Sequence, residues 1–472
     1  MTISSPVWNQ VIQFSEWFFL IYFLAMNTGY IVLNLLSIIS LRRYLPSDAL
    51  HDLPQVYSGL ELPISILVPA YNEEATITPT IYSLLQLSYP ILEIIIINDG
   101  SKDATLDTLK RDFSLLPFPE AYRIKLATKS IRCVYRSSTH PSVRVIDKEN
   151  GGKADSLNAG INASRYPLFC NVDADTVLER DSLQRIVYPF LEDQRVVATG
   201  GTVRIANGCD VSGGFLVKVR LPTNLLALFQ VVEYMRAFLF GRLGWSAIGG
   251  LLIISGAFGL FRKETVLLAG GFRVNTIGED MELVVRIHRL LRKQKKPYRM
   301  VFLPDPVAWT EAPEDLRNLK NQRVRWQRGL TESLTSNFGL MFSRNGGVPG
   351  WVAFPFMMFF EWLGPLVELT GYILMVTFFW FGLISEYAFW MFIFATIGFG
   401  LLLSMSGLFL EEMSFHTYTR PRDLVWLLGA VVLENLGYRQ LNSVWRLIGL
   451  FKWLAGSKSK WGEMTRIATL KN

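Results

Sequence analysis

An uncharged apolar stretch near the start of the chain sets the first limit on its fold. Trp17–Leu41 contains no charged residue, and about 20 residues of this kind are enough to cross a bilayer. Arg42 and Arg43 follow at once, and positive residues that flank a span stay on the cytoplasmic side. The pattern predicts a transmembrane helix with its N-terminus outside and with residue 42 onward in the cytoplasm.

The C-terminal third of the chain is also membrane-like. Leu369–Ser385 and Tyr387–Leu410 are uncharged and predict two further spans. Upstream, Glu361 and Glu368 are seven residues apart, which places them on similar faces of a helix. They either line a polar path or lie in an interfacial helix before the span. Leu424–Leu433 begins a fourth segment, which we interpret as re-entrant or interfacial.

The region between these spans has the pattern of an α/β domain. Apolar runs at Ile64–Val68, Ile91–Ile97 and Tyr166–Val172 alternate with stretches of helical spacing, such as Glu74–Gln86. Continuous apolar strands between helices are typical of a parallel sheet covered on both faces. Polar residues follow each run, and ligands bind at that edge of such sheets. We therefore predict a doubly wound domain with a site beyond the strand ends.

One segment inside this region has a different character. Residues 212–250 are apolar but carry Lys218, Arg220, Arg236 and Arg242, which is typical of a helix in the membrane interface. The predicted organisation is an N-terminal transmembrane helix over 1–43, a cytoplasmic domain over 44–335 that includes this helix, interfacial and transmembrane helices over 336–456, and a cytoplasmic tail over 457–472.

Composition narrows the chemistry. Only 18% of the 472 residues are charged, below the usual fraction of about 25%, as expected for a chain that is partly in the membrane. The three cysteines form no CxxC or Cys/His cluster, so neither a zinc site nor a disulfide framework is indicated. Histidine occurs four times, which disfavours histidine-led catalysis. The net charge is +7, and the basic residues matter mainly for where they lie. We expect the lipid bilayer, and no nucleic acid, among the partners.

Candidate ligand-binding residues stand at the ends of the first two runs. A short carboxylate or an aromatic side chain at a strand end can bind a base or a ribose through its hydrogen-bonding edge. Alternatively, Asn98-Asp99-Gly100 is a simple turn. The candidates are Pro69, Tyr71, Glu73 and Asp99. Gly151 and Gly152 then let the backbone approach a ligand closely, so that Lys153 can reach a phosphate, unless the loop is merely flexible.

Acidic and basic motifs follow in order along the chain. Asp173 and Asp175 end the third run, and carboxylates there can hold Mg²⁺ or Mn²⁺. Glu279 and Asp280 precede a predicted helix over 281–292; Asp280 is either a helix cap or a general base. Downstream stand the residues of a QxxRW motif, which a helix would place on adjoining sides of one turn. They are Gln322, Arg325 and Trp326.

This ordered set resembles the D, DxD, (T/G)ED and QxxRW signature of processive family-2 glycosyltransferases. These include the poly-N-acetylglucosamine, hyaluronan and cellulose synthases. The resemblance covers about residues 60–330 and implies a GT-A fold, inversion and β-linkages. It implies that Asp99 contacts the nucleoside, Asp175 the metal, and that Asp280 is the base. Gln322, Arg325 and Trp326 would hold the diphosphate and the acceptor.

The same resemblance assigns Ser255 and Gly256 to an acceptor-side loop. Two departures are plain: Gly278 stands where Thr is common, and neither an FxVTxKG-like segment nor a cyclic-di-GMP-binding domain is found. The glycine is a permitted variant of the motif, whereas the two absences argue against a bacterial cellulose synthase proper.

We expect an inner-membrane, multi-pass synthase that uses a UDP-sugar donor, extends a growing polysaccharide, conducts it across the bilayer and works with an accessory subunit. Alternatives are transfer of one sugar to a membrane lipid, an idle scaffold and a transporter.

Overall fold

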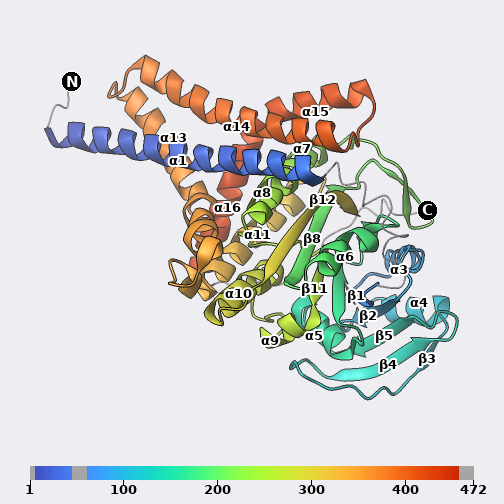
Figure 1. The fold of residues 1–472 in the computed structure, drawn as a ribbon. Coiled ribbons are helices and arrows are strands. Elements are labelled where there is room, and N and C mark those ends of the chain that lie inside the picture. The colour runs from blue at the N-terminus through green and yellow to red at the C-terminus, as the bar shows by residue number, and fades with distance from the viewer. Residues whose placement is uncertain (1–5, 45–60, 457–472) are drawn as a thin grey trace.

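A mixed sheet of ten strands runs through the centre of the computed structural model, which describes residues 6–44 and 61–456 (Figure 1). The strand order is β3-β4-β5-β2-β1-β6-β11-β8-β12-β7. These strands are β1 (Ile64–Ala70), β2 (Leu92–Asn98), β3 (Leu115–Pro117), β4 (Ile131–Ser137), β5 (Val143–Lys148), β6 (Leu168–Val172), β7 (Val177–Leu178), β8 (Val196–Ile205), β11 (Phe258–Arg262) and β12 (Arg299–Thr310).

The predicted parallel sheet is confirmed for part of this order. β5, β2, β1 and β6 are parallel neighbours. Their apolar runs are continuous because helices pack on the sheet, and every residue of β6 is buried. β11 lies antiparallel between β6 and β8, so a wholly parallel sheet is wrong. Phe258 pairs with Val172, so β11 begins at the edge where β6 ends and must run back across the sheet.

Helices cover the sheet and connect its strands. α5 packs on β1 and β2, and α6 packs on β8 and β12. The helices of this part are α3 (Ile77–Leu85), α4 (Thr105–Asp112), α5 (Lys153–Ala163), α6 (Ser182–Glu192), α9 (Lys263–Leu268), α10 (Glu279–Lys293) and α11 (Leu316–Ser336). The predicted helices over 74–86 and 281–292 correspond to α3 and α10.

The segment predicted as one interfacial helix over 212–250 is partly wrong. It begins in a hairpin of β9 (Asp210–Ser212) and β10 (Phe215–Lys218). Gly213 and Gly214 make the turn with φ of 60° and 82°, which glycine adopts at little cost. Helical structure starts only at α7 (Leu225–Met235), which continues through the π-helical turn η2 (Arg236–Arg242) into α8 (Leu243–Ala247).

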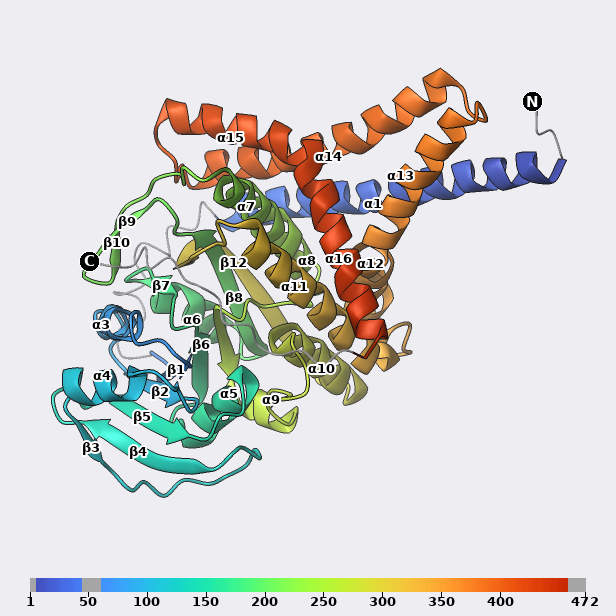
Figure 2. The same cartoon turned by 180° about the vertical axis from the view of Figure 1, so that it is seen from behind.

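Apolar helices gather at one end of the molecule, and β3 and β4 lie at the other (Figures 1 and 2). Ile12–Tyr44 of α1 (Pro6–Tyr44) and α14 (Glu386–Ser414) are long and apolar enough to cross a membrane. The stretch Pro349–Trp362 and α13 (Gly364–Trp380) form a third candidate if this pair, bent by 42°, is one broken span. The spans predicted from Trp17 and Tyr387 fall within α1 and α14.

The remaining helices complete this end of the molecule. They are η3 (Phe338–Leu340), η4 (Pro349–Ala353), α12 (Phe354–Phe356), η5 (Met357–Trp362), α15 (Pro421–Leu433), η6 (Glu434–Tyr438) and α16 (Arg439–Leu454). α15 contains the fourth apolar segment, and neither it nor α16 is a candidate span. The tail predicted over 457–472 lies outside the described residues.

A buried ion pair joins the sheet to the membrane-like helices. Arg204 of β8 donates two hydrogen bonds to Glu411 of α14, with N–O distances of 2.6 and 2.7 Å. Their side chains are only 6% and 2% exposed. A planar guanidinium matches a carboxylate in this two-point geometry. The pair therefore fixes the angle at which α14 leaves the α/β domain.

We predict that Arg204→Met destabilises the protein by about 3–5 kcal/mol, because it leaves the Glu411 carboxylate buried without its partner. Thermal unfolding in detergent measures this effect. The double variant Arg204→Met/Glu411→Leu should recover most of the loss, since no charge then remains buried. Arg195→Met, which removes an exposed pair with Asp193, is the control. Equal midpoints for Arg204→Met and wild type would contradict the prediction.

Candidate active site

One cavity of about 1440 Å³ is lined by every residue that the sequence singles out for the site. These residues are Pro69, Tyr71, Glu73, Asp99, Lys153, Asp173, Asp175, Ser255, Gly256, Glu279, Asp280, Gln322, Arg325 and Trp326. The ends of β1, β2 and β6 place the first of them at one edge of the sheet, because these strands run parallel. The predicted site is therefore brought together in space.

Asp99 organises the glycine loop at this edge. It is 3% exposed, and its carboxylate accepts hydrogen bonds from the amides of Gly151 and Gly152 at 2.9 and 2.7 Å. Buried Lys148 donates to the same carboxylate at 2.6 Å and also pairs with Asp155. These contacts hold the loop against the end of β2 and set the start of α5, where Lys153 is the first residue.

Lys153 links three segments of the site. Its ammonium group pairs with Asp173, donates to the Gly256 carbonyl at 3.2 Å and lies 4.0 Å from the Glu279 carboxylate. Burial lowers the pKa of Lys153, but Asp173 and Glu279 outweigh burial and raise it. Lys153 is therefore a firmly charged cation among carboxylates.

The acidic motif begins α10. Asp280 accepts hydrogen bonds from the Gly256 amide at 3.0 Å and from the Met281 amide at 2.8 Å. Glu279 is 7% exposed. Burial raises its pKa to about 7, Lys153 lowers it and the neighbouring Asp280 raises it. The two adjacent carboxyl groups thus have different surroundings. Glu279 is buried beside Lys153, whereas Asp280 is hydrogen-bonded to the acceptor-side loop.

Close packing against α11 explains why position 278 is glycine. A Cβ atom on Gly278 would lie 2.8 Å from the Cα of Gly329 in α11, and a Cβ on Gly329 would lie 2.9 Å from the Cα of Gly278. Real Cβ contacts do not come this close, so both positions need glycine. The departure from threonine in the motif is therefore matched by a second glycine, three residues after Trp326.

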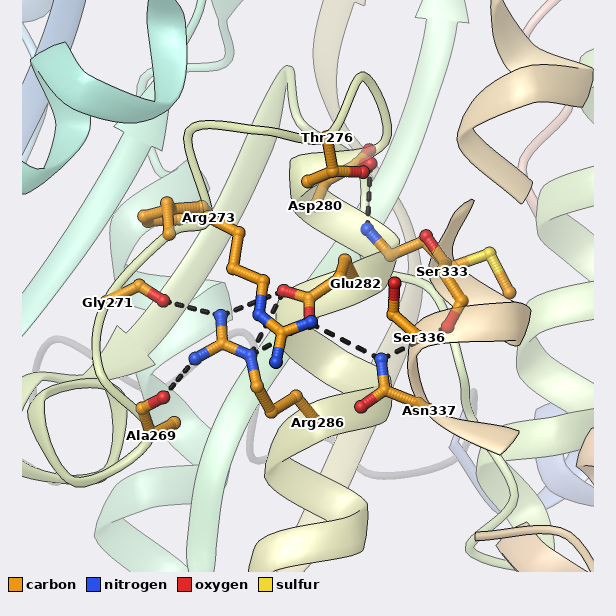
Figure 3. Close-up of polar contacts among 12 residues, drawn as sticks. Ala269, Gly271, Arg273, Thr276, Asp280, Glu282, Arg286, Ser333, Ser336 and Asn337 are labelled. Carbon is orange, nitrogen blue, oxygen red and sulfur yellow. Dashed lines mark hydrogen bonds and ion pairs between the residues drawn. The ribbon is translucent and has the colours of Figure 1, made fainter. Parts of the chain in front are cut away.

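A buried polar cluster, which the sequence did not predict, supports the start of α10 (Figure 3). Glu282 is fully buried and accepts hydrogen bonds from Arg286 and Asn337, and it also pairs with Arg273. Arg286 in turn donates to the carbonyls of Ala269 and Gly271. The cluster holds the loop over residues 269–278 onto α10. The i, i+4 spacing of Glu282 and Arg286 was its only signal in the sequence.

The QxxRW residues lie on α11 and face the cavity. Gln322 is 8% exposed and its Oε1 has no hydrogen-bond partner among the described residues. Trp326 is 42% exposed, and the guanidinium of Arg323 lies 4.3 Å from its ring centroid. Arg323 donates to Glu233 of α7 at 2.7 Å. The motif therefore presents an amide, a guanidinium and an indole to one space.

The residues present fit a divalent cation that shares its ligands with a substrate. Asp173 and Asp175 offer hard oxygen ligands on one loop. Within residues 6–44 and 61–456, no group of three or more acidic, His or Cys side chains is placed to hold a metal alone. Mg²⁺ and Mn²⁺ sites with two carboxylates are completed by phosphate oxygens and water. Such an ion would neutralise charge on a diphosphate.

The same cavity continues among the membrane-like helices. Glu361 and Glu368 both line it, which supports the first of the two sequence interpretations. Arg446 of α16 pairs with Glu361 at 3.2 Å and donates to Gln327 at 2.8 Å. Ser443 donates to Glu368 at 2.7 Å. A polar path thus extends from the acidic motif into helices that are otherwise apolar.

Comparison with known proteins identifies the family. The profile described as "Glycosyl transferase family 2" matches residues 65–213, and that described as "Glycosyl transferase family group 2" matches residues 169–407, about half of the chain. The chain belongs to glycosyltransferase family 2. It is therefore an inverting glycosyltransferase that uses a nucleotide sugar.

Curated relatives of this glycosyltransferase are polysaccharide synthases. It is 30% identical over 275 residues to a poly-beta-1,6-N-acetyl-D-glucosamine synthase of Staphylococcus aureus (strain COL), which covers 58% of this chain and 56% of the relative. It is 29% identical over 276 residues to the synthase of the same name from Staphylococcus epidermidis. The match thus spans little more than half the length of these relatives.

A solved structure supports the fold. The mannosyltransferase of Pyrobaculum calidifontis, determined with GDP-mannose and Mn²⁺, superposes with a TM-score of 0.51 at 18% sequence identity. The match covers 88% of this glycosyltransferase and 98% of that chain. This likeness confirms the predicted α/β fold of the GT-A type.

We predict that one residue makes a contribution to the free energy of unfolding that falls by up to about 3 kcal/mol as the pH rises from about 4.5 to about 7. The cause is Glu279, whose pKa is raised to about 7 in the folded protein. In that range the folded state keeps a proton that the unfolded state has lost. In thermal unfolding in detergent with EDTA, the unfolding temperature of Glu279→Gln should rise relative to that of wild type as the pH approaches 8.

The exposed carboxylate Glu264 provides the control for this measurement. Glu264→Gln should follow the wild-type curve at each pH. Parallel curves for Glu279→Gln and wild type would show that Glu279 titrates normally.

Proposed function

We propose that this protein polymerises N-acetylglucosamine from a UDP-activated donor into a β-linked polysaccharide at the cytoplasmic face of the inner membrane. The single observation that supports this most is the shared cavity. The predicted donor, metal, base and acceptor residues line one space, and that space continues among the membrane-like helices. The choice of sugar rests on the names of the Staphylococcus relatives.

In the proposed reaction, an acceptor hydroxyl oxygen attacks the anomeric carbon of the donor sugar. The bond from that carbon to the diphosphate breaks, the nucleoside diphosphate leaves, and the hydroxyl proton passes to Asp280. Asp280 suits this role because Gly256 and Met281 fix both carboxylate oxygens by hydrogen bonds. Positioning of the two reactants supplies much of the rate.

The remaining cavity residues hold the donor and the acceptor. We assign Pro69, Tyr71, Glu73 and Asp99 to the nucleoside and its loop, and Lys153 to the diphosphate. Asp173 and Asp175 would hold Mg²⁺ or Mn²⁺, which offsets the negative charge of the leaving group. Arg325 can bind diphosphate oxygens in a fork. Gln322, Trp326 and Ser255 are assigned to the acceptor side.

We further propose that the polymer leaves through the polar path among the membrane-like helices. Charged side chains inside a membrane usually face a polar cavity, and Glu361 and Glu368 line this one. The path contains both acidic and basic groups, paired as Glu361 with Arg446, which suits an uncharged sugar chain. A multi-pass topology, a cytoplasmic catalytic domain and an accessory subunit belong to the same proposal.

The proposal predicts that Asp280→Asn lowers transfer by at least about 10²- to 10⁴-fold, the usual contribution of a general base. UDP binding in the presence of Mn²⁺ should stay unchanged, because the substitution keeps the shape of the side chain. Sugar incorporation and UDP affinity are measured on the same preparation. Equal losses of both would make Asp280 a structural residue.

Product analysis with purified protein in detergent tests the function itself. With UDP-N-acetylglucosamine and Mn²⁺ we expect a long product from this donor alone, no product in EDTA, and recovery when Mn²⁺ is added in excess. One sugar on a lipid would support the lipid-acceptor alternative. A product from another single UDP-sugar would correct the donor, and full activity in EDTA would contradict the metal role of Asp173 and Asp175.

A further inference from the structure

Arg242, in the 212–250 segment, lines the cavity but has no role in the proposed mechanism. The sequence places it with basic residues expected to face the membrane interface. In the structure it ends η2 and lines the cavity. Its guanidinium lies over the Phe238 ring, 3.8 Å from the centroid, and its Nη1 atom is buried. A cation has therefore been turned inward.

Arg242 has no acidic ion-pair partner among the described residues, whereas three other arginines that line the cavity do. Arg236 pairs with Glu434, Arg323 with Glu233 and Arg446 with Glu361. Among the described residues, the buried Nη1 of Arg242 has no hydrogen-bond partner. A buried N–H group without an acceptor is costly, and almost all such groups in folded proteins are satisfied. The missing acceptor is therefore expected to come from a ligand.

The backbone that carries Arg242 is held firmly. Ser37 of α1 donates a hydrogen bond to the Phe240 carbonyl at 2.8 Å. A Cβ on Gly244 would lie 2.5 Å from the Leu33 carbonyl oxygen, so α1 and α8 are in close contact there. π-helical turns such as η2 occur frequently at functional sites. Arg242 is thus fixed towards the cavity before any ligand arrives.

The charge of Arg242 acts close to the proposed base. Burial lowers its pKa to about 10, while Asp280 and Tyr234 oppose this shift, so Arg242 remains protonated at neutral pH. Lys153, in contrast, is engaged with Asp173 and Glu279. Asp280 therefore interacts electrostatically with two cations, Arg242 and Lys153. Of these, Lys153 lies at the strand ends, where the donor is expected to bind.

We propose that Arg242 binds the acceptor, donating hydrogen bonds to oxygen atoms of the terminal sugar whose hydroxyl faces Asp280. This inference rests on the proposed function and deepens it. A guanidinium offers five N–H donors in a planar fork, which suits neighbouring hydroxyl and carbonyl oxygens on one sugar. The Phe238 ring beneath the guanidinium keeps its plane fixed. A donor diphosphate is the competing ligand of the same chemistry.

Two binding measurements on the full-length protein in detergent separate these ligands. The acceptor probe is a β-1,6-linked N-acetylglucosamine tetramer, and the donor-site probe is UDP with Mn²⁺. We expect Arg242→Gln to weaken tetramer binding by about 10- to 100-fold, the usual effect of losing hydrogen bonds to a charged group, and to leave UDP binding unchanged. Arg242→Lys should fall between, because it keeps the charge and loses the fork.

Stability distinguishes ligand binding from a structural role. If Arg242 serves a ligand, Arg242→Gln should unfold at the same temperature as wild type or higher, since it removes a buried N–H group that has no acceptor. Arg180→Gln is the matched control. Arg180 also lies over an aromatic ring, Phe215, at 4.3 Å, but outside the cavity. It should change neither binding constant.

Each outcome is decisive. Equal weakening of UDP and tetramer binding would place Arg242 in the donor site and overturn the proposal. Unchanged tetramer binding in Arg242→Gln would also overturn it. So would a wild-type protein that binds no tetramer. If wild type binds the tetramer and Arg242→Gln does not, while no N-acetylglucosamine is transferred from its UDP donor, the proposed function fails and the acceptor site stands.

Discussion

The ion pair between Lys153 and Asp173 lies at the centre of the site. The other segments of the site depend on the positive charge of Lys153. Lys153 also reaches Glu279 and the Gly256 carbonyl, so one ammonium group joins the glycine loop, the DxD loop, the acidic motif and the acceptor-side loop. Four of the carboxylates that line the cavity lie on these segments, at Asp173, Asp175, Glu279 and Asp280. A diphosphate entering it would meet net negative charge, which is a physical reason to expect a divalent cation. The raised pKa of Glu279 relieves part of the same repulsion.

The sequence predicted the strand-end part of this site because sheet geometry is local and regular. Carboxyl ends of parallel strands share an edge, so Asp99 and Asp173 had to lie near each other once β2, β1 and β6 were recognised. The antiparallel β11 and the β9–β10 hairpin were missed, since both depend on where the chain returns after leaving the sheet. The inward direction of Arg242 was missed for a related reason. The helical turn that carries it is held by contacts with α1, about 200 residues earlier in the chain.

The contact between Gly278 and Gly329 explains how the acidic motif and the QxxRW helix act as one unit. At this contact the two backbones touch without side chains between them, so the start of α10 packs directly against α11. Ser333 donates to the Gly278 carbonyl at 3.3 Å, and Glu332 accepts from the Ile277 amide at 2.8 Å, so the same turn of α11 also holds the loop before α10. The distance between the proposed base and the proposed diphosphate ligands is thus set by helix packing. No spacing rule in the sequence could show this, because the two glycines are far apart in the chain.

Polar groups among apolar helices need partners, and here they find them across the cavity. Arg446 connects Gln327 of α11 with Glu361 of the bent pair, so the residue next to Trp326 is tied to this pair near its bend. Glu368 is held in turn by Ser443 and Tyr372. These contacts give partners to Glu361, Glu368 and Arg446 without filling the space between them. On the proposed function, a sugar chain displacing water from this path would meet fixed hydrogen-bonding groups of both signs. Such a lining can bind each successive sugar weakly, which holds the acceptor near Asp280 and still allows it to move on.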